Sequence, residues 1–93
     1  QFELSLKDRD AYLKIDPTNP AIHYERGVCN YNLGNVSEAV VDFSKAISLS
    51  NTQATYYIGR ATANKKLGNI NAVQADVTQA KQLGAAIPDY LLN

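Results

Sequence analysis

The side chains best suited to chemistry are one histidine and one cysteine, His23 and Cys29. A catalytic histidine needs a nucleophile or a carboxylate held beside it, and a structural metal site needs several ligands at characteristic spacings. No second Cys or His keeps such a spacing, and neither a Gly-rich phosphate loop nor paired carboxylates are visible. We therefore interpret His23 as a half-buried helix residue and Cys29 as a buried, inert thiol. We predict no enzyme, no catalytic residue, no metal site and no cofactor.

Tyrosines are the next candidates, because Tyr56–Tyr57 together with Tyr24 and Tyr31 could stack against nucleic-acid bases. Such a platform needs a basic field to attract phosphates. Nine basic and nine acidic residues instead give a net charge of zero. We interpret the tyrosines as core and groove aromatics and predict no nucleic-acid partner. Lys65–Lys66, at the end of an expected helix, complements the helix dipole.

Nothing in the hydropathy pattern predicts contact with the membrane interior. The unbroken apolar runs are only a few residues long, too short to cross a bilayer, and the first residues do not resemble a signal peptide. The 93 residues suit one small domain, and the absence of Met suggests a piece of a longer protein. A single Cys excludes an internal disulfide and leaves the cellular compartment open.

An internal repeat indicates which elements position these side chains. Residues 20–50 align with 54–84 without a gap, at an offset of 34 positions. The identities are Arg26/Arg60, Asn30/Asn64, Leu33/Leu67, Gly34/Gly68, Asn35/Asn69, Asp42/Asp76, Ala46/Ala80 and Leu49/Leu83. A fixed period of this size is typical of a stacked array of supersecondary units.

Each unit is predicted to be two helices joined at a tight corner. Pro20 suits a first helical turn, and Gly34 suits the left-handed residue that closes a helix. Leu33 would make the last apolar contact of its helix, and the side chain of Asn35 would cap the next one. The apolar spacing predicts five helices and no strand, at 3–15, 20–33, 36–49, 53–67 and 70–83.

Small and paired residues predict how the helices meet. Gly27, Ala39 and Ala46 would let helix axes approach closely, with Phe43 filling the space beside them. The corresponding set in the second unit is Ala61, Val73, Val77 and Ala80. The repeated Arg and Asp positions further predict ion pairs, each Arg with the Asp of its own unit or the preceding one. These residues are Arg26, Asp42, Arg60 and Asp76.

Units of 34 residues with Gly27, Ala39, Phe43 and Ala46, and with Asp16–Pro17 before the first of them, resemble tetratricopeptide repeats. The resemblance implies an all-α fold, a right-handed α-α superhelix in one domain. Its units would be the second helix of a partial repeat at 1–19, repeats at 20–53 and 54–87, and a C-terminal stub at 88–93. The sequence departs from the family pattern at several positions: His23 and Tyr57 hold the early aromatic position, Arg26 and Arg60 replace a leucine, Val77 replaces the large aromatic, and no proline follows Leu49 or Leu83.

The resemblance also implies a non-enzymatic scaffold that binds a protein or peptide on the concave face formed by the first helix of each pair. Mapped by the repeat, that face comprises Ala21, Tyr24, Glu25, Val28, Tyr31, Asn32, Thr55, Ile58, Gly59, Thr62, Lys65 and Lys66. Chaperone-binding members clamp a carboxylate with Lys and Asn there, but the matching positions hold Tyr24, Val28 and Thr62. We expect a partner segment without strong charge. The predicted contacts are Tyr24, Val28, Tyr31, Asn32, Ile58, Thr62 and Lys65.

A structural role is the alternative hypothesis. The repeats would then only stack on neighbouring repeats or on another copy of the chain, giving a homo-oligomer through exposed repeat ends. The apolar residues of the stub would fold back on the last helix or dock on another copy. These residues are Ile87, Tyr90, Leu91 and Leu92.

Overall fold

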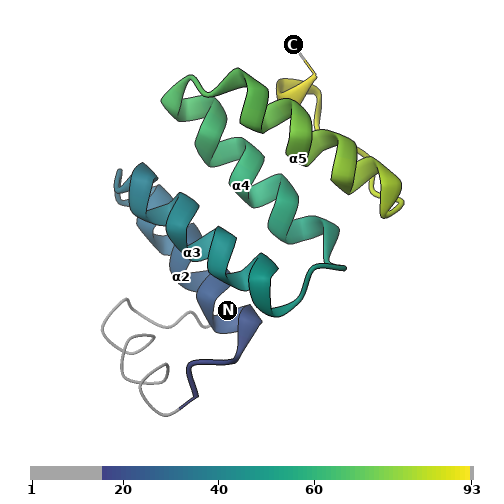
Figure 1. Cartoon of the computed structure of the whole chain (residues 1–93). Coiled ribbons are helices and arrows are strands. Elements are labelled where there is room, and N and C mark those ends of the chain that lie inside the picture. The colour runs from purple at the N-terminus through teal and green to yellow at the C-terminus, as the bar shows by residue number, and fades with distance from the viewer. Residues whose placement is uncertain (1–15, 93) are drawn as a thin grey trace.

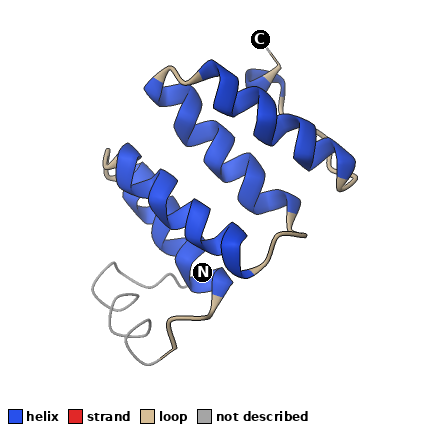
Figure 2. Cartoon of the chain, viewed as in Figure 1, coloured by secondary structure: helices blue, strands red, loops and turns tan. Residues whose placement is uncertain are grey.

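The computed structural model describes residues 16–92, which form two helical hairpins followed by a short 3₁₀ helix (Figure 1). The elements are α2 at Pro20–Asn32, α3 at Val36–Leu49, α4 at Ala54–Leu67, α5 at Ile70–Gln82 and η1 at Asp89–Leu91. The described residues contain no strand (Figure 2), so the prediction of an all-α repeat fold is confirmed. The four predicted helices in this range match within one residue at each end. The predicted helix at 3–15 lies outside the described residues.

The two hairpins pack side by side through their inner helices. Helix α3 packs against α2 within its hairpin and against α4 of the next one, while α4 packs against α5 (Figure 1). Helix α2 also contacts α4, so the first helices of the two units are neighbours. None of the described helices is long and apolar enough to cross a membrane.

The corner between the helices of each unit is built around a left-handed glycine. Gly34 has φ of 89° and Gly68 has φ of 83°, values that favour glycine. The next amide closes the corner in both units: the N–H of Asn35 donates to the carbonyl of Asn30 at 2.8 Å, and the N–H of Asn69 donates to that of Asn64 at 2.9 Å. The glycine is therefore the predicted terminator, and its return after 34 positions repeats one backbone geometry.

The other two roles predicted at this corner are wrong. Leu33 is 62% exposed and makes no last core contact. Asn35 forms no side-chain cap; its Nδ2 instead donates to Oδ1 of Asn30 at 3.3 Å. Asn30 is buried, and its own Nδ2 donates to Asp42 of α3 at 2.8 Å, so a chain of hydrogen bonds links Asn35, Asn30 and Asp42. The asparagine repeats because it ties the corner to a buried polar group on the preceding helix.

Phe43 fills the space where the two hairpins meet. A Cβ on Gly27 would lie 2.7 Å from Cε1 of Phe43, closer than real contacts allow. A Cβ on Gly59 of the next unit would lie 3.0 Å from the same atom. The ring of Phe43, on α3, is thus held between Gly27 of α2 and Gly59 of α4. The predicted close approach at Gly27 is confirmed, and Ala39 and Ala46 are fully buried as expected.

Both predicted Arg–Asp pairs form within their own units, with different geometry. Arg60 donates from Nε to one oxygen of Asp76 at 2.9 Å and from Nη2 to the other at 2.8 Å. Its Nη1 donates to Ser44 Oγ of the preceding unit at 3.1 Å, so one guanidinium joins α3, α4 and α5. In the first unit, Arg26 Nε lies 3.8 Å from Asp42 Oδ2.

The C-terminal stub folds back on the second hairpin, as predicted. Leu91 of η1 is 5% exposed and packs with Val73, Val77 and Ala61, with Ile87 alongside. Tyr90 and Leu92, by contrast, remain about half exposed. Leu91 packs in the same cluster as Val77, the residue one period after Phe43.

Candidate functional site

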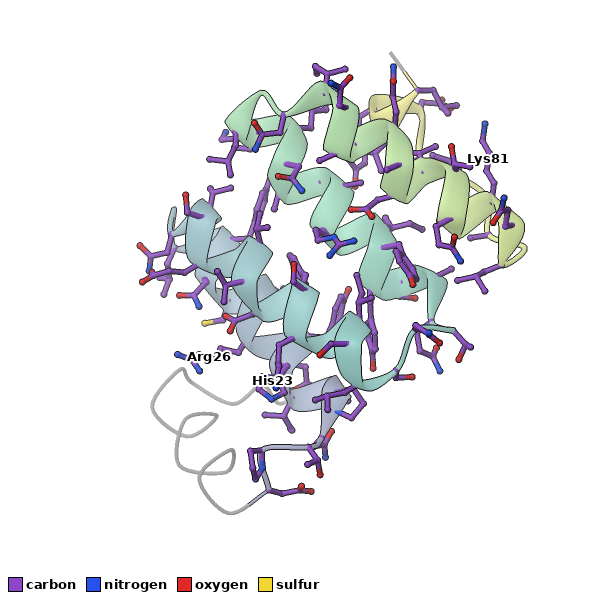
Figure 3. All side chains as sticks on the ribbon, viewed as in Figure 1. His23, Arg26 and Lys81 are labelled. Carbon is purple, nitrogen blue, oxygen red and sulfur yellow. The ribbon has the colours of Figure 1, made fainter. Side chains whose placement is uncertain are left out.

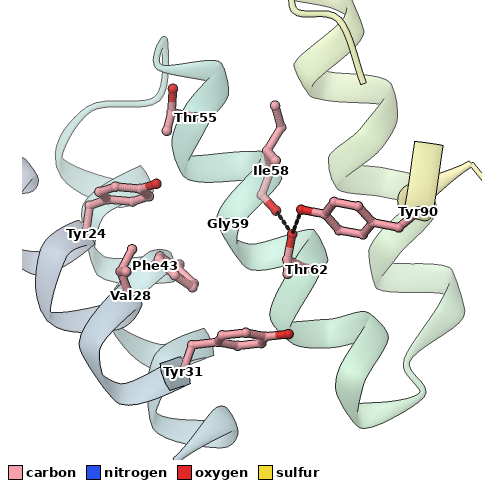
Figure 4. Close-up of a pocket in the computed structure, with 9 residues that line it drawn as sticks. All are labelled: Tyr24, Val28, Tyr31, Phe43, Thr55, Ile58, Gly59, Thr62 and Tyr90. Atoms are coloured by element: carbon pink, nitrogen blue, oxygen red, sulfur yellow. Dashed lines mark hydrogen bonds between the residues drawn. The ribbon is translucent and has the colours of Figure 1, made fainter. Parts of the chain in front are cut away.

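A pocket of about 220 Å³ lies between α2 and α4 (Figure 4). It is the candidate site because residues of both units and of η1 line it, and none of these residues is charged. Its lining residues are Tyr24, Val28, Tyr31, Phe43, Thr55, Ile58, Gly59, Thr62 and Tyr90. The floor exists because Gly59 has no side chain and Phe43 reaches through from α3.

An aromatic cluster forms one wall of the pocket. The ring of Tyr24 lies 5.5 Å from that of Phe43 and 5.2 Å from that of Tyr56, both tilted. Burial raises the pKa of the Tyr24 hydroxyl above its ordinary value, and the nearby hydroxyls of Tyr56 and Tyr90 raise it further. The wall is therefore uncharged at neutral pH and presents ring faces and phenol hydroxyls.

The opposite wall carries the polar contacts of the site. Thr62 Oγ1 donates to the carbonyl of Ile58 at 2.8 Å and lies 3.0 Å from the hydroxyl of Tyr90 (Figure 4). One turn further along α4, Lys65 Nζ donates to the backbone carbonyl of Tyr90. Both of these polar contacts between the C-terminal segment and α4 come from Tyr90.

The structure brings five of the seven predicted contact residues together in this pocket, and leaves two outside. The five are Tyr24, Val28, Tyr31, Ile58 and Thr62. Asn32 is exposed at the end of α2 and lines no part of the pocket. Lys65 lines a second concavity, together with Ile70 and Leu92, on the α5 side.

Four further lining residues were not among the predicted contacts. Thr55 and Gly59 belong to the face that the repeat maps, although neither was singled out as a contact. Phe43 belongs to α3 and reaches the pocket because Gly27 and Gly59 leave room for its ring. The prediction that Phe43 fills the space beside Gly27 could have identified it as a lining residue. Tyr90 lies one period after Tyr56, a signal that the prediction of contact residues did not use.

The remaining chemical candidates are structural. His23 is buried, and its Nε2 lies 2.8 Å from the carbonyl of Pro17, which gives the ring a backbone partner. It lies well apart from Lys81 on α5 (Figure 3). Cys29 is a free thiol, but only partly buried, so the prediction of a buried thiol was too strong. Within residues 16–92 no group of His, Cys, Asp and Glu could hold a metal ion.

Comparison with known proteins agrees with the geometry. Residues 20–52 match the model of the tetratricopeptide repeat family. Among solved structures, the chain resembles the first TPR of Spaghetti (RPAP3) bound to the HSP90 peptide SRMEEVD, with a TM-score of 0.82 at 20% sequence identity. That match covers 85% of this chain and 63% of the other one, so this chain spans less than two thirds of it. The comparison with curated proteins found no match. Residues 20–52 thus match one tetratricopeptide repeat, and the four α-helices within residues 16–92 fit about two repeats of this kind.

Proposed function

We propose that this chain is a non-enzymatic protein-interaction module that binds a segment of another protein on its concave face, in the pocket between α2 and α4. The observation that carries the proposal is the pocket itself, which is uncharged and lined by apolar and tyrosine side chains of both repeats. Protein segments are bound in this way by arrays that use several shallow contacts along one face.

The chemistry of the lining defines the kind of segment it would take. An apolar side chain moved from water into such a pocket contributes about 1.5–3 kcal/mol. Tyr24 and Tyr31 are rigid, amphipathic anchors that lose little entropy on binding. With only two repeats lining the face, we expect an affinity of about 1 μM or weaker.

The similar solved structure supports a protein or peptide as the class of partner, but with a different charge. The peptide in that complex, SRMEEVD, is acidic. Here no basic residue lines the pocket, and Tyr24, Val28 and Thr62 stand where chaperone-binding relatives carry clamp residues. We therefore propose a partner segment with an apolar side chain and no cluster of acidic residues.

A matched pair of valines tests the proposal. The full chain is screened against an array of uncharged and acidic peptides, and the strongest binder is titrated against Val28→Ala and Val41→Ala. Val28 lines the pocket, whereas Val41 on α3 is 66% exposed and lies outside it. We expect Val28→Ala to weaken binding by at least threefold and Val41→Ala to leave it unchanged. Preferential binding of the acidic peptides would contradict the proposed specificity.

Self-association remains the second candidate, and one observation favours it. Ile70 and Leu92 are each about half exposed and flank the second concavity, which also includes Leu91 and Lys81. Such a surface suits stacking on another helical unit. Light scattering across a concentration series separates the two functions, because a stacking role predicts a mass that rises with concentration and falls in Ile70→Glu.

A further inference from the structure

Tyr90 occupies the polar end of the proposed binding pocket in the manner of a ligand. We infer that its side chain is an intramolecular competitor: the hydroxyl of Tyr90 holds the Thr62 hydroxyl that an incoming peptide would use. The inference rests on the proposed function and concerns the regulation of that same site.

The direction of the Tyr90–Thr62 hydrogen bond follows from counting protons. A threonine hydroxyl has one hydrogen, and Thr62 gives it to the carbonyl of Ile58 at 2.8 Å. The bond of 3.0 Å between the hydroxyls of Thr62 and Tyr90 must then be donated by Tyr90. Toward the pocket, Thr62 therefore acts as an acceptor only.

Lys65 holds the backbone of the same residue in place. Its Nζ donates to the main-chain carbonyl of Tyr90, a bond that persists when the Tyr90 side chain turns away. Lys65 lies outside the pocket, so the group for which a peptide would compete is the Thr62 hydroxyl. An extended peptide can offer that acceptor a backbone N–H, as Tyr90 offers its hydroxyl.

In the C-terminal segment, the residue that anchors the backbone, Leu91, is separate from the residue whose side chain competes for the site, Tyr90. Leu91 is almost completely buried against α4 and α5, whereas Tyr90 is half exposed. Rotation of the Tyr90 side chain would free Thr62 without removing Leu91 from the core. The hydrogen bond of the Tyr90 hydroxyl is exposed, and such a bond contributes little net stability, so a partner can displace it.

A small probe tests the competition without a known partner. The full chain, labelled for nuclear magnetic resonance, is titrated with N-acetyl-tyrosinamide, which carries a phenol, a carbonyl and amide N–H groups. In Tyr90→Ala, which removes the hydroxyl and keeps the backbone carbonyl, we expect shifts centred on Thr62 and binding roughly three- to tenfold tighter than in the unmodified chain, where the Thr62 hydroxyl is already bonded. Tyr90→Phe, which keeps the ring and loses the donor, should lie between the two.

Two controls make the result specific. Leu92→Ala changes the neighbouring half-exposed residue, which does not line the pocket, and should bind as the unmodified chain does. N-acetyl-phenylalaninamide, which lacks the hydroxyl, should bind Tyr90→Ala more weakly than the tyrosine probe. Equal binding by the unmodified chain and Tyr90→Ala, or shifts away from Thr62, would overturn the inference. Failure of the proposed function would look different: a peptide partner would bind and be indifferent to Val28→Ala.

Discussion

Gly59 of the second repeat lies against Phe43 of the first, so closely that a methyl group on Gly59 would sit 3.0 Å from the ring. This contact has two consequences. It sets the spacing of α3 and α4, and it leaves the outer side of Gly59 open as the floor of the pocket beside Tyr24. Packing between repeats and the shape of the candidate site therefore depend on the same pair of residues.

The first prediction concerns the other glycine that touches Phe43. Gly27→Leu should destabilise the chain by about 1–3 kcal/mol, because even a Cβ would meet the ring at 2.7 Å. Ala46→Leu should act similarly, since Ala46 has no exposed surface. Urea unfolding followed by circular dichroism measures both. An unchanged transition midpoint for the two variants would show that these positions are not in close contact.

The second prediction compares the two Arg–Asp pairs. Arg60→Lys should cost about 1 kcal/mol, because a lysine cannot reproduce the two parallel hydrogen bonds to Asp76. Arg26→Lys should cost less, because its Nε lies 3.8 Å from Asp42 and the side chain is more exposed. The two variants are matched chemically, so the difference between their unfolding free energies is the test. Equal losses would mean that the bidentate geometry contributes nothing.

The pKa of Arg60 bears on the pH range over which its pair persists. The hydrogen bond to Asp76 raises the pKa of Arg60, against the opposing effect of burial. Because the folded state holds this proton more tightly than the unfolded state does, the group stabilises the fold at pH values below its unfolded-state pKa. That stabilisation is lost only as the pH rises through the folded-state pKa. That loss lies at strongly alkaline pH, so the arginine stays charged at every pH used for the comparison.

The third prediction concerns alkaline pH. The pKa of Tyr24 is raised by burial, and then by Tyr56 and Tyr90, so the folded state holds the phenol proton more tightly than the unfolded state does. Stability from this group is therefore complete below about pH 10 and is lost as pH rises through the folded-state pKa. Thermal unfolding at several pH values should show a fall above pH ~10 that is smaller in Tyr24→Phe. Identical pH profiles would exclude Tyr24 as the source.

The sequence predicted the repeat fold well because the signals are local and occur twice. Gly34 and Gly68 mark the same corner, and the helix bounds follow from it within one residue. The role of Asn35 was misassigned because an asparagine after a helix can cap the next helix or bond backward. Only the buried position of Asn30 decides between these, and burial is not a local property.

The candidate site was predictable where it follows the period. Tyr24 and Val28 on α2, and Ile58 and Thr62 on α4, repeat one face of a helix and meet in the pocket. Lys65 continues that face, yet its amine turns to the carbonyl of Tyr90. Tyr90 lies one period after Tyr56, whose ring packs beside that of Tyr24, so the 34-residue period was the signal that could have placed it near this face.

The fourth prediction uses two adjacent leucines to test how the C-terminal segment is held. Leu91→Ala should destabilise the chain by about 2–5 kcal/mol, because it empties a buried position beside Val73 and Val77. Leu92→Ala should change stability by less than about 0.5 kcal/mol, because this side chain is half exposed. Differential scanning calorimetry compares the two. Similar melting temperatures for both variants would mean that η1 does not anchor on the second repeat.

The most direct test of the central claim is a calorimetric titration of the partner peptide into the chain and into Tyr31→Ala. Tyr31 lines the pocket from the end of α2 and is only partly buried against the cluster that contains Phe43, so its removal should leave folding intact. The proposed groove predicts that binding weakens by more than about 1 kcal/mol, as expected for an aromatic anchor, while Val41→Ala on the outer face has no effect. Unchanged affinity in Tyr31→Ala, with binding abolished by Val41→Ala, would contradict the account and place the partner on the outer helices.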